Sequence, residues 1–207
     1  PLYQTNLIPF PNTCEERMGI APVSGRAPCA VFLDRDGVLN RAVVRDGKPY
    51  PPGSAEDVEI LPGVPQALDQ LKRAGFLLLV VTNQPDVGSG KQSREAVESI
   101  HSLLRAALPL DDIFVCYHVA ADACNCRKPA PGMLEQAAAR FGLSLPGCYM
   151  VGDRWRDVDA GHRAGCRTIL LDYGYQERPA DNEPSARVTS LMEAAGWILQ
   201  DAAKRAQ

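Results

Sequence analysis

The sequence lacks the features that define several classes of protein. No apolar run approaches the ~20 residues that span a bilayer, and the longest, at 76–81, has the size of a strand. Aromatic residues make up 6% of the 207 residues, Lys and Arg form no long cluster, and the formal net charge is -3. Nucleic-acid-binding surfaces usually combine a basic stripe with stacking aromatic rings. We therefore expect a small-molecule partner, with no nucleic acid and no membrane.

The first residues also lack the basic start and apolar block of a secretory signal. They show no sustained hydrophobic period, so we predict an N-terminal extension over residues 1–28. The chain contains 45% hydrophobic and 23% charged residues, which is ordinary for a globular domain. We expect one such domain over residues 29–207, in a cytoplasmic and monomeric protein.

Short apolar runs alternate with helical patterns throughout this domain. Val64, Ala67, Leu68 and Leu71, for example, follow the i, i+3, i+4, i+7 spacing of an amphipathic helix. Near-continuous apolar strands between such helices are typical of a parallel sheet that is covered on both faces. We therefore predict an α/β fold with a doubly wound parallel sheet. The expected strands are 30–33, 76–81, 113–116, 148–151 and 168–171, and the expected helices lie around 64–71, 97–104, 134–141 and 187–199.

Polar side chains follow each of the first four expected strands. Because the carboxyl ends of parallel strands meet at one edge of a sheet, we expect these side chains to converge. Taken singly, each is explained by a turn, a cap or a solvated surface. Together with the cation of Lys128, they supply the carboxylates and the hydroxyl that phosphoryl transfer requires. The four clusters are Asp34-Arg35-Asp36, Thr82-Asn83-Gln84, Cys116-Tyr117-His118 and Gly152-Asp153.

Four segments resemble the four motifs of the haloacid dehalogenase phosphatases. The resemblance covers roughly residues 30–175 and implies a Rossmann-like fold and hydrolysis of the phosphomonoester of a small sugar phosphate. Within this superfamily, the run from Cys126 to Met133 is similar to the heptose bisphosphate phosphatases and, a little less closely, to the histidinol phosphatases. The four segments are 34–40, 82–84, 126–129 and 151–153.

The resemblance also implies a role for individual residues. Asp34 would be the nucleophile and form an aspartyl phosphate, because a carboxylate is ionised at neutral pH and needs no activating base. Asp36 would act as general acid and base. Mg²⁺ would be held by Asp34, the main-chain carbonyl of Asp36 and Asp153. Thr82 and Lys128 would bind the oxygens of the transferring phosphoryl group.

Three cysteines and one histidine lie close together in the sequence. An odd total of seven cysteines, without a secretory signal, argues against a disulfide framework. Four ligands close a tetrahedral Zn²⁺ site, so we predict a structural zinc, and related phosphatases carry such a loop at this place. The loop ends directly in Arg127 and would orient the side chains that bind substrate. The ligands are Cys116, His118, Cys124 and Cys126.

The segments between the motifs leave no room for a cap domain. Residues 41–63 are few and rich in Pro and Gly, so we predict a capless protein with an open site. Substrate selection then falls to side chains around the opening, and Arg127 is the natural ligand for a second phosphate because its guanidinium is a fixed fork. The expected substrate-binding residues are Asn40, Tyr50, Asn83, Gln84 and Arg127.

Alternatives remain open at this stage. The family usually continues with Asn-Gln-Ser after the motif threonine, whereas here Pro85 follows Gln84, and the extra acid Asp86 would lie near a substrate anion. We favour loss of the 7-phosphate from a heptose 1,7-bisphosphate, with histidinol phosphate or another small monoester as the alternative substrate. A non-catalytic scaffold that carries zinc is disfavoured, because it has no need of the complete catalytic set. His101 and His162 are assigned no role.

Overall fold

The structure, a computed structural model, describes residues 28–205, so the predicted extension lies outside it except for residue 28. Its largest feature is a six-stranded sheet in the order β5-β4-β1-β6-β7-β8, in which every pair of neighbours is parallel. These strands are β1 (Ala30–Leu33), β4 (Leu77–Asn83), β5 (Asp112–Cys116), β6 (Tyr149–Gly152), β7 (Arg167–Leu171) and β8 (Ala186–Val188). A separate antiparallel hairpin consists of β2 (Val43–Arg45) and β3 (Lys48–Tyr50).

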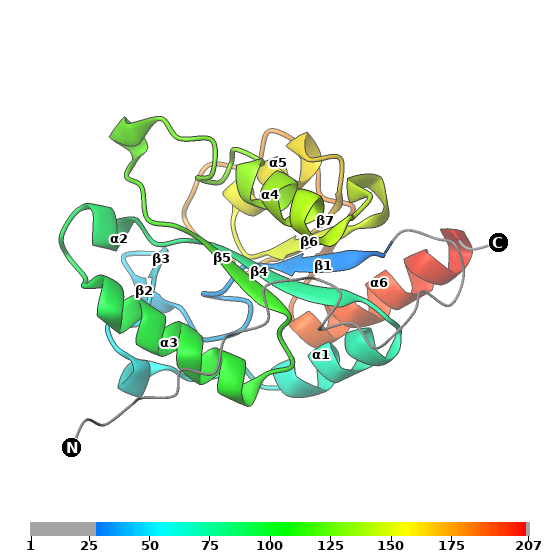
Figure 1. The fold of residues 1–207 in the computed structure, drawn as a ribbon, viewed down its shortest axis with the longest axis horizontal. Coiled ribbons are helices and arrows are strands. Elements are labelled where there is room, and N and C mark those ends of the chain that lie inside the picture. Colours follow the sequence, from blue (N-terminus) through cyan, green and yellow to red (C-terminus); the bar gives the residue numbers. More distant parts are fainter. Residues whose placement is uncertain (1–27, 206–207) are drawn as a thin grey trace, which may run out of the picture.

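Helices cover both faces of the sheet, as Figure 1 shows. The helices α1, α3 and α6 lie on one face, and α4 and α5 lie on the other. Their bounds are α1 (Val64–Arg73), α2 (Pro85–Gly88), α3 (Arg94–Ala107), α4 (Gly132–Phe141), α5 (Trp155–Arg163) and α6 (Leu191–Arg205). None of the described helices is sufficiently long and apolar to pass through a bilayer.

Two hydrophobic cores follow from this layering. Successive side chains of a strand point to opposite faces, so Val31 and Leu33 join the core beneath α1, α3 and α6, whereas Ala30 and Phe32 join the core beneath α4 and α5. All four of these side chains are fully buried. The strand β1 is thus buried on both faces, which explains why its sequence is an unbroken apolar run and confirms the predicted doubly wound sheet.

The five expected strands are present with small shifts at their ends, but one expected helix began too early. The segment 187–199 was predicted to be helical from its first residue, and this is wrong. Arg187 lies instead in β8, paired with Leu170 of β7, and α6 begins at Leu191. The Ser190 hydroxyl accepts a hydrogen bond from the Glu193 amide at 3.2 Å, which caps the start of the helix.

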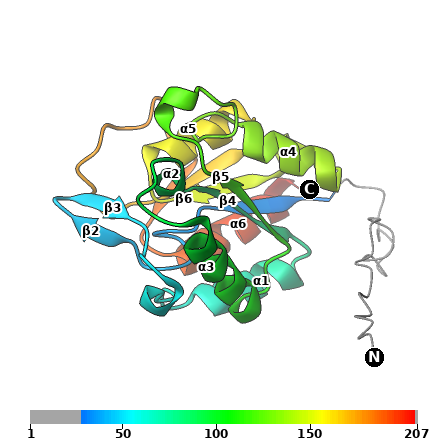
Figure 2. The ribbon, with the colours of Figure 1, turned by 60° about the vertical axis from the view of Figure 1, so that its left-hand side comes forward.

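The segment 41–63 forms the hairpin β2–β3 and a 3₁₀ turn, Ala55–Asp57, and no larger unit. Figure 2 shows the hairpin projecting beyond the body of the sheet. Strand β3 and the residue that follows it line the pocket described below. These residues are Lys48, Pro49, Tyr50 and Pro51. The segment therefore contributes a small hairpin to the rim of the site and no cap domain.

Candidate active site

The loop after β1 is fixed by main-chain hydrogen bonds. The Asp34 amide donates to the Val151 carbonyl of β6 at 2.9 Å, and the Gly37 amide donates to the Asn40 carbonyl at 2.7 Å. Gly37 has φ +83°, and a Cβ atom at this position would lie 1.9 Å from Asp153 Oδ2. Only glycine permits both the left-handed backbone and this approach. The loop can therefore bring Asp34 against Asp153 from the neighbouring strand.

Three buried carboxylates meet beside Lys128. Oxygens of Asp34, Asp153 and Asp157 all lie within 4.8 Å of one another. The Lys128 ammonium lies 3.0 Å from Asp34 Oδ1 and 2.5 Å from Asp157 Oδ1, and its side chain is 2% exposed. Neither carboxylate oxygen of Asp153 has a hydrogen-bond partner among the described residues. Three acids facing one ammonium, with two unpaired oxygens, fit a hard divalent cation such as Mg²⁺.

The electrostatics of this cluster agree with that fit. Burial, together with the charges of Asp34 and Asp157, raises the pKa of Asp153 well above its ordinary value. Burial likewise raises the pKa of Asp34 to about 6, although the neighbouring Lys128 ammonium opposes the shift. Both pKa shifts arise first from burial, which penalises the ionised carboxylate. A bound cation would supply positive charge that favours the ionised form.

Asp157 belongs to this cluster, and the sequence analysis gave it no role. It is the third residue of α5, where its Oδ2 accepts a hydrogen bond from the Arg154 amide at 3.1 Å while Oδ1 faces Lys128. A Cβ atom on Gly152 would lie 2.1 Å from Asp157 Cβ, so glycine is required for this contact. The available signal was the spacing of one helical turn between Asp153 and Asp157.

Asp36 is held by three side chains. Arg35 donates to it from Nε at 3.1 Å and Nη2 at 2.9 Å, and the amides of Asn40 and Gln84 donate at 2.9 Å each. Burial alone would raise the pKa of Asp36, but the Arg35 guanidinium and these hydrogen bonds outweigh it and lower the pKa below its ordinary value. Asn40 and Gln84 were predicted to contact substrate. In the structure their amides lie against Asp36.

Thr82 and Asn83 are the last two residues of β4. The Thr82 hydroxyl accepts a hydrogen bond from the Gln84 amide at 3.0 Å. Asn83 makes two hydrogen bonds with the main chain of Lys128, donating to its carbonyl and accepting from its amide at 3.0 Å each. Asn83 was predicted to contact substrate, and the structure shows that it also fixes the position of Lys128.

A cavity of about 200 Å³ joins these groups. The predicted catalytic residues Asp34, Asp36, Thr82 and Lys128 all line it, together with Asp153. The predicted substrate-binding residues Tyr50, Asn83 and Arg127 line it as well, whereas Asn40 and Gln84 are buried against Asp36.

One part of the cavity lining is basic, and we call it the basic wall. It consists of Arg127, Arg154 and Arg156, together with Lys48 of the hairpin. Arg154 is neutralised by an ion pair with Glu177. Burial and the positive charges of Arg154 and Arg127 lower the pKa of Arg156. Guanidinium groups that crowd together in this way favour the binding of an anion between them.

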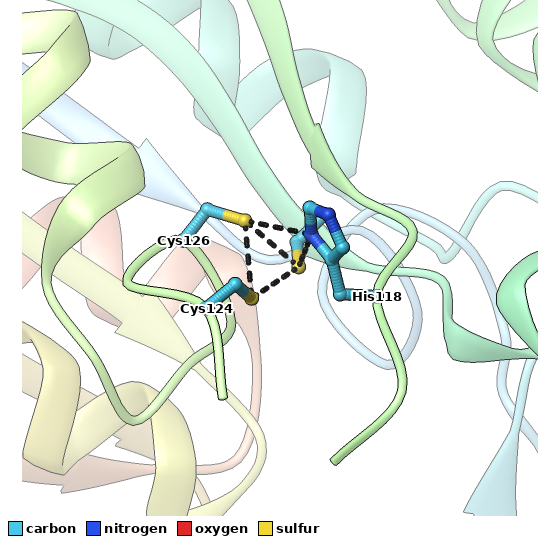
Figure 3. Close-up of side chains that lie close together, drawn as sticks. His118, Cys124 and Cys126 are labelled. Carbon is cyan, nitrogen blue, oxygen red and sulfur yellow. Dashed lines mark hydrogen bonds between the residues drawn. The ribbon is translucent and has the colours of Figure 1, made fainter. Parts of the chain in front are cut away.

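The predicted zinc ligands come together at the end of β5. Figure 3 shows His118, Cys124 and Cys126 turned toward one another. Sulfur to sulfur distances among the three cysteines are 3.1, 3.4 and 3.7 Å, and His118 Nδ1 lies 3.2 Å from Cys126 Sγ and 3.6 Å from Cys116 Sγ. Zinc to sulfur bonds of ~2.3 Å in a tetrahedron place sulfurs roughly 3.7 Å apart. One sulfur pair has this spacing and the other two are closer, so the four ligand atoms converge enough for one zinc ion to be held by all of them.

Comparisons with known proteins agree with this geometry. Residues 32–156 match the polynucleotide kinase 3 phosphatase family model, and residues 125–194 match the HAD-hydrolase-like model. The D-glycero-beta-D-manno-heptose-1,7-bisphosphate 7-phosphatase of Bordetella bronchiseptica is 36% identical over 152 residues, which cover 70% of this chain and 80% of that protein. The chain belongs to the haloacid dehalogenase phosphatase family. Its predicted class, a hydrolase of phosphate monoesters, is thereby confirmed.

A further relative and a solved structure match more of the chain. The D-glycero-D-manno-heptose-1,7-bisphosphate 7-phosphatase of Thermosynechococcus vestitus is 33% identical over 198 residues, with 85% of this chain and 98% of that protein covered. A crystal structure of the D,D-heptose 1,7-bisphosphate phosphatase from B. bronchiseptica, complexed with magnesium and phosphate, matches with a TM-score of 0.68 and 31% identity. The match covers 84% of this chain and 99% of that one.

Proposed function

We propose that the chain is a Mg²⁺-dependent phosphatase that removes the 7-phosphate of a D-glycero-D-manno-heptose 1,7-bisphosphate through a phosphorylated Asp34. The main observation that supports it is the cavity in which Asp34, Asp36, Thr82, Lys128 and Asp153 meet. These are a nucleophile, an acid and base, two donors to phosphoryl oxygens and a metal ligand. The names of the relatives at 33% and 36% identity supply the substrate.

In the first half-reaction, Asp34 attacks phosphorus, and the bond from phosphorus to the sugar oxygen breaks. Asp34, Asp153 and the main-chain carbonyl of Asp36 would hold Mg²⁺, whose positive charge would offset the repulsion between nucleophile and phosphate. Ion pairs with Asp34 and Asp157 hold the Lys128 ammonium in place. Lys128 and Thr82 both donate hydrogen bonds to the phosphoryl oxygens.

Asp36 transfers the protons in both half-reactions. Its hydrogen bonds and lowered pKa describe the anionic state, in which it takes a proton from the water that hydrolyses the aspartyl phosphate. The negative charge of an incoming phosphate raises its pKa, so that it carries a proton when the sugar alkoxide leaves. That proton goes to the alkoxide oxygen, which departs as a hydroxyl.

The basic wall would bind the second phosphate. Arg127 donates from Nη1 to the His118 carbonyl at 3.1 Å, which ties its guanidinium to the zinc-ligand loop. The remaining donors of Arg127 can form a fork on an anion together with Arg156. We further propose that Zn²⁺ bound by Cys116, His118, Cys124 and Cys126 is structural and keeps this loop in place.

The first test is phosphate release with heptose 1,7-bisphosphate as substrate, in the presence of Mg²⁺. We expect turnover by the wild-type protein and none by Asp34→Asn, because an amide cannot form the acyl phosphate. Asp69→Asn, an exposed change on α1, is the control and should leave the rate unchanged. Near-wild-type turnover by Asp34→Asn would contradict the covalent mechanism.

The second candidate substrate is histidinol phosphate, which is favoured by one observation. Asp86 lines the same cavity and could pair with a cationic group of the substrate. The two substrates are to be compared by kcat/KM with the same preparation. Faster turnover of histidinol phosphate, together with its loss in Asp86→Asn, would replace the heptose proposal but leave the phosphatase chemistry intact.

A further inference from the structure

Arg35 lies between the two aspartates of the first motif, and its side chain is completely buried. One edge of its guanidinium is occupied by Asp36, through the two nitrogens Nε and Nη2. The third nitrogen, Nη1, lies 3.1 Å from Nε2 of His101, in the middle of α3. His101 therefore contacts the group that contacts Asp36, from a helix that contributes no residue to the cavity.

The chemistry of this contact fixes the state of the imidazole. A guanidinium can only donate hydrogen bonds, so Nε2 of His101 must accept, and its proton must reside on Nδ1. Burial and the charge of Arg35 lower the pKa of His101 to about 4, which keeps the ring neutral. His101 is 1% exposed, and its Nδ1 faces Glu98 Oε2 at 3.6 Å, beyond hydrogen-bond distance. The principal polar contact of the ring is thus Arg35.

We propose that His101 is a positioning residue: its neutral ring holds the Arg35 fork in the orientation that aims the Asp36 carboxylate at the leaving oxygen. This inference rests on the proposed role of Asp36 as the acid. A long arginine side chain has several rotamers. Two hydrogen bonds to the next residue in the chain do not fix one rotamer, because Asp36 can move together with Arg35. The third bond, to a separate helix, does. Without it, Arg35 can turn toward Asp34 and carry Asp36 away from the substrate.

The contacts continue beyond His101. Glu98, one helical turn earlier, accepts a hydrogen bond from the Tyr117 hydroxyl, and the Arg94 guanidinium lies 4.9 Å from the centre of the Tyr117 ring. Tyr117 lies between the zinc-ligand candidates Cys116 and His118. The helix α3 that carries His101 is therefore itself fixed against the loop that leads to Lys128.

The leaving group of the substrate distinguishes positioning of an acid from general damage. A sugar alkoxide needs a proton to depart, whereas the nitrophenolate of p-nitrophenyl phosphate does not. In His101→Leu we expect kcat/KM for the sugar phosphate to fall by about 10- to 100-fold, with a loss of less than about 3-fold for p-nitrophenyl phosphate. In His101→Gln the amide oxygen can accept from Arg35, and most of the lost activity should return.

Leu104→Ala is the matched control, because Leu104 is fully buried on the same helix but belongs to the hydrophobic core and offers Arg35 no hydrogen-bond acceptor. It should destabilise the protein and affect both substrates equally, in proportion to the folded fraction. Equal losses on both substrates in His101→Leu, or a Gln variant no better than the Leu variant, would show that His101 is only structural.

A measurement on the wild-type protein decides the matter even where the Leu variant does not fold. Nitrogen-15 NMR of the His101 ring should show a proton on Nδ1 and an unprotonated Nε2, and the reverse tautomer would overturn the inference. Failure of the proposed function looks different: the wild-type protein would then release phosphate from neither substrate, while the ring would still show its tautomer.

Discussion

Arg127 is the residue on which the choice of substrate depends most. Its guanidinium lies on the cavity wall next to Lys128, so a substrate phosphate at a distance from the reacting one can reach it. Losing such a charged contact costs on the order of 2–4 kcal/mol. We expect Arg127→Ala to lower kcat/KM for the heptose bisphosphate by ~30- to 1,000-fold, with little effect on a simple monoester.

The control for this prediction is Arg73→Ala, which removes an exposed guanidinium that pairs with Asp69 of its own helix. It should leave both substrates unaffected. Equal losses on the bisphosphate and the monoester in Arg127→Ala would mean that Arg127 acts on the transferring phosphate, and the distal-phosphate proposal would have to be abandoned.

Individual residues differed in how far the sequence could place them. Asp34, Thr82 and Asp153 meet as expected, because each lies at the carboxyl end of a strand of one parallel sheet. Asp157 was given no role, although its spacing from Asp153 was an available signal, and His101 could not be placed in this way. Both lie within helices, and a helical residue's partner depends on the packing of that helix against the rest of the fold, which periodicity alone does not reveal.

At the scale of elements, the loop between β5 and α4 carries the next prediction. We expect one zinc per chain, bound by the four ligands named above, and a lower melting temperature when it is removed, because the ion would tie the end of β5 to the loop that follows it. Cys124→Ser should lose the metal. Cys166→Ala, a cysteine buried beneath α4 and α5 and outside the cluster, should keep it.

The two measurements are metal analysis of protein purified without chelators and thermal melting with and without chelation. Removing zinc should lower the melting temperature more than omitting Mg²⁺ does, because zinc closes the loop whereas Mg²⁺ binds residues that the sheet already holds. Absence of zinc from the purified protein, or full zinc content in Cys124→Ser, would refute the prediction.

Short elements explain what the sequence analysis missed. The hairpin β2–β3 was not predicted, although Asp46 and Gly47 between its strands both have positive φ, 49° and 70°, and Asp-Gly is a strong signal for such a turn. Its strand β2 is exposed along its whole length, so the apolar alternation that identifies longer strands is absent. β8 has three residues and gives no period at all.

At the scale of the whole molecule, the buried acids make stability depend on pH. Asp34 and Asp153 have raised pKa values, so the folded state holds protons that the unfolded chain has released. Their contribution to stability is complete at low pH and is lost as pH rises, for Asp34 through a pKa of about 6. Asp36 has a lowered pKa, so it stabilises the folded state at neutral pH. This stabilisation is lost as the pH falls below the ordinary pKa of an aspartate.

We therefore expect the protein without added Mg²⁺ to be most stable in mild acid, and its melting temperature to fall by about 5 °C between about pH 5 and pH 8. Added Mg²⁺ should restore the loss at the higher pH, because it neutralises the acids. Asp153→Asn, which removes one of the charges without changing the shape, should flatten the curve and abolish the gain from Mg²⁺. Identical pH curves for the two proteins would contradict this account.

The doubly wound sheet itself was predictable, because strands that are buried on both faces must be apolar along their whole length. The order of those strands has a further consequence, for how the chain folds. β1 is made first but lies inside the sheet, where Val31 pairs with Leu78 on one side and with Tyr149 on the other. Pairing between such distant segments is slow, because a long loop must close before any contact is gained. One edge of β1 therefore stays open until β6 has been synthesised, and the first appearance of activity should mark the moment at which that edge closes.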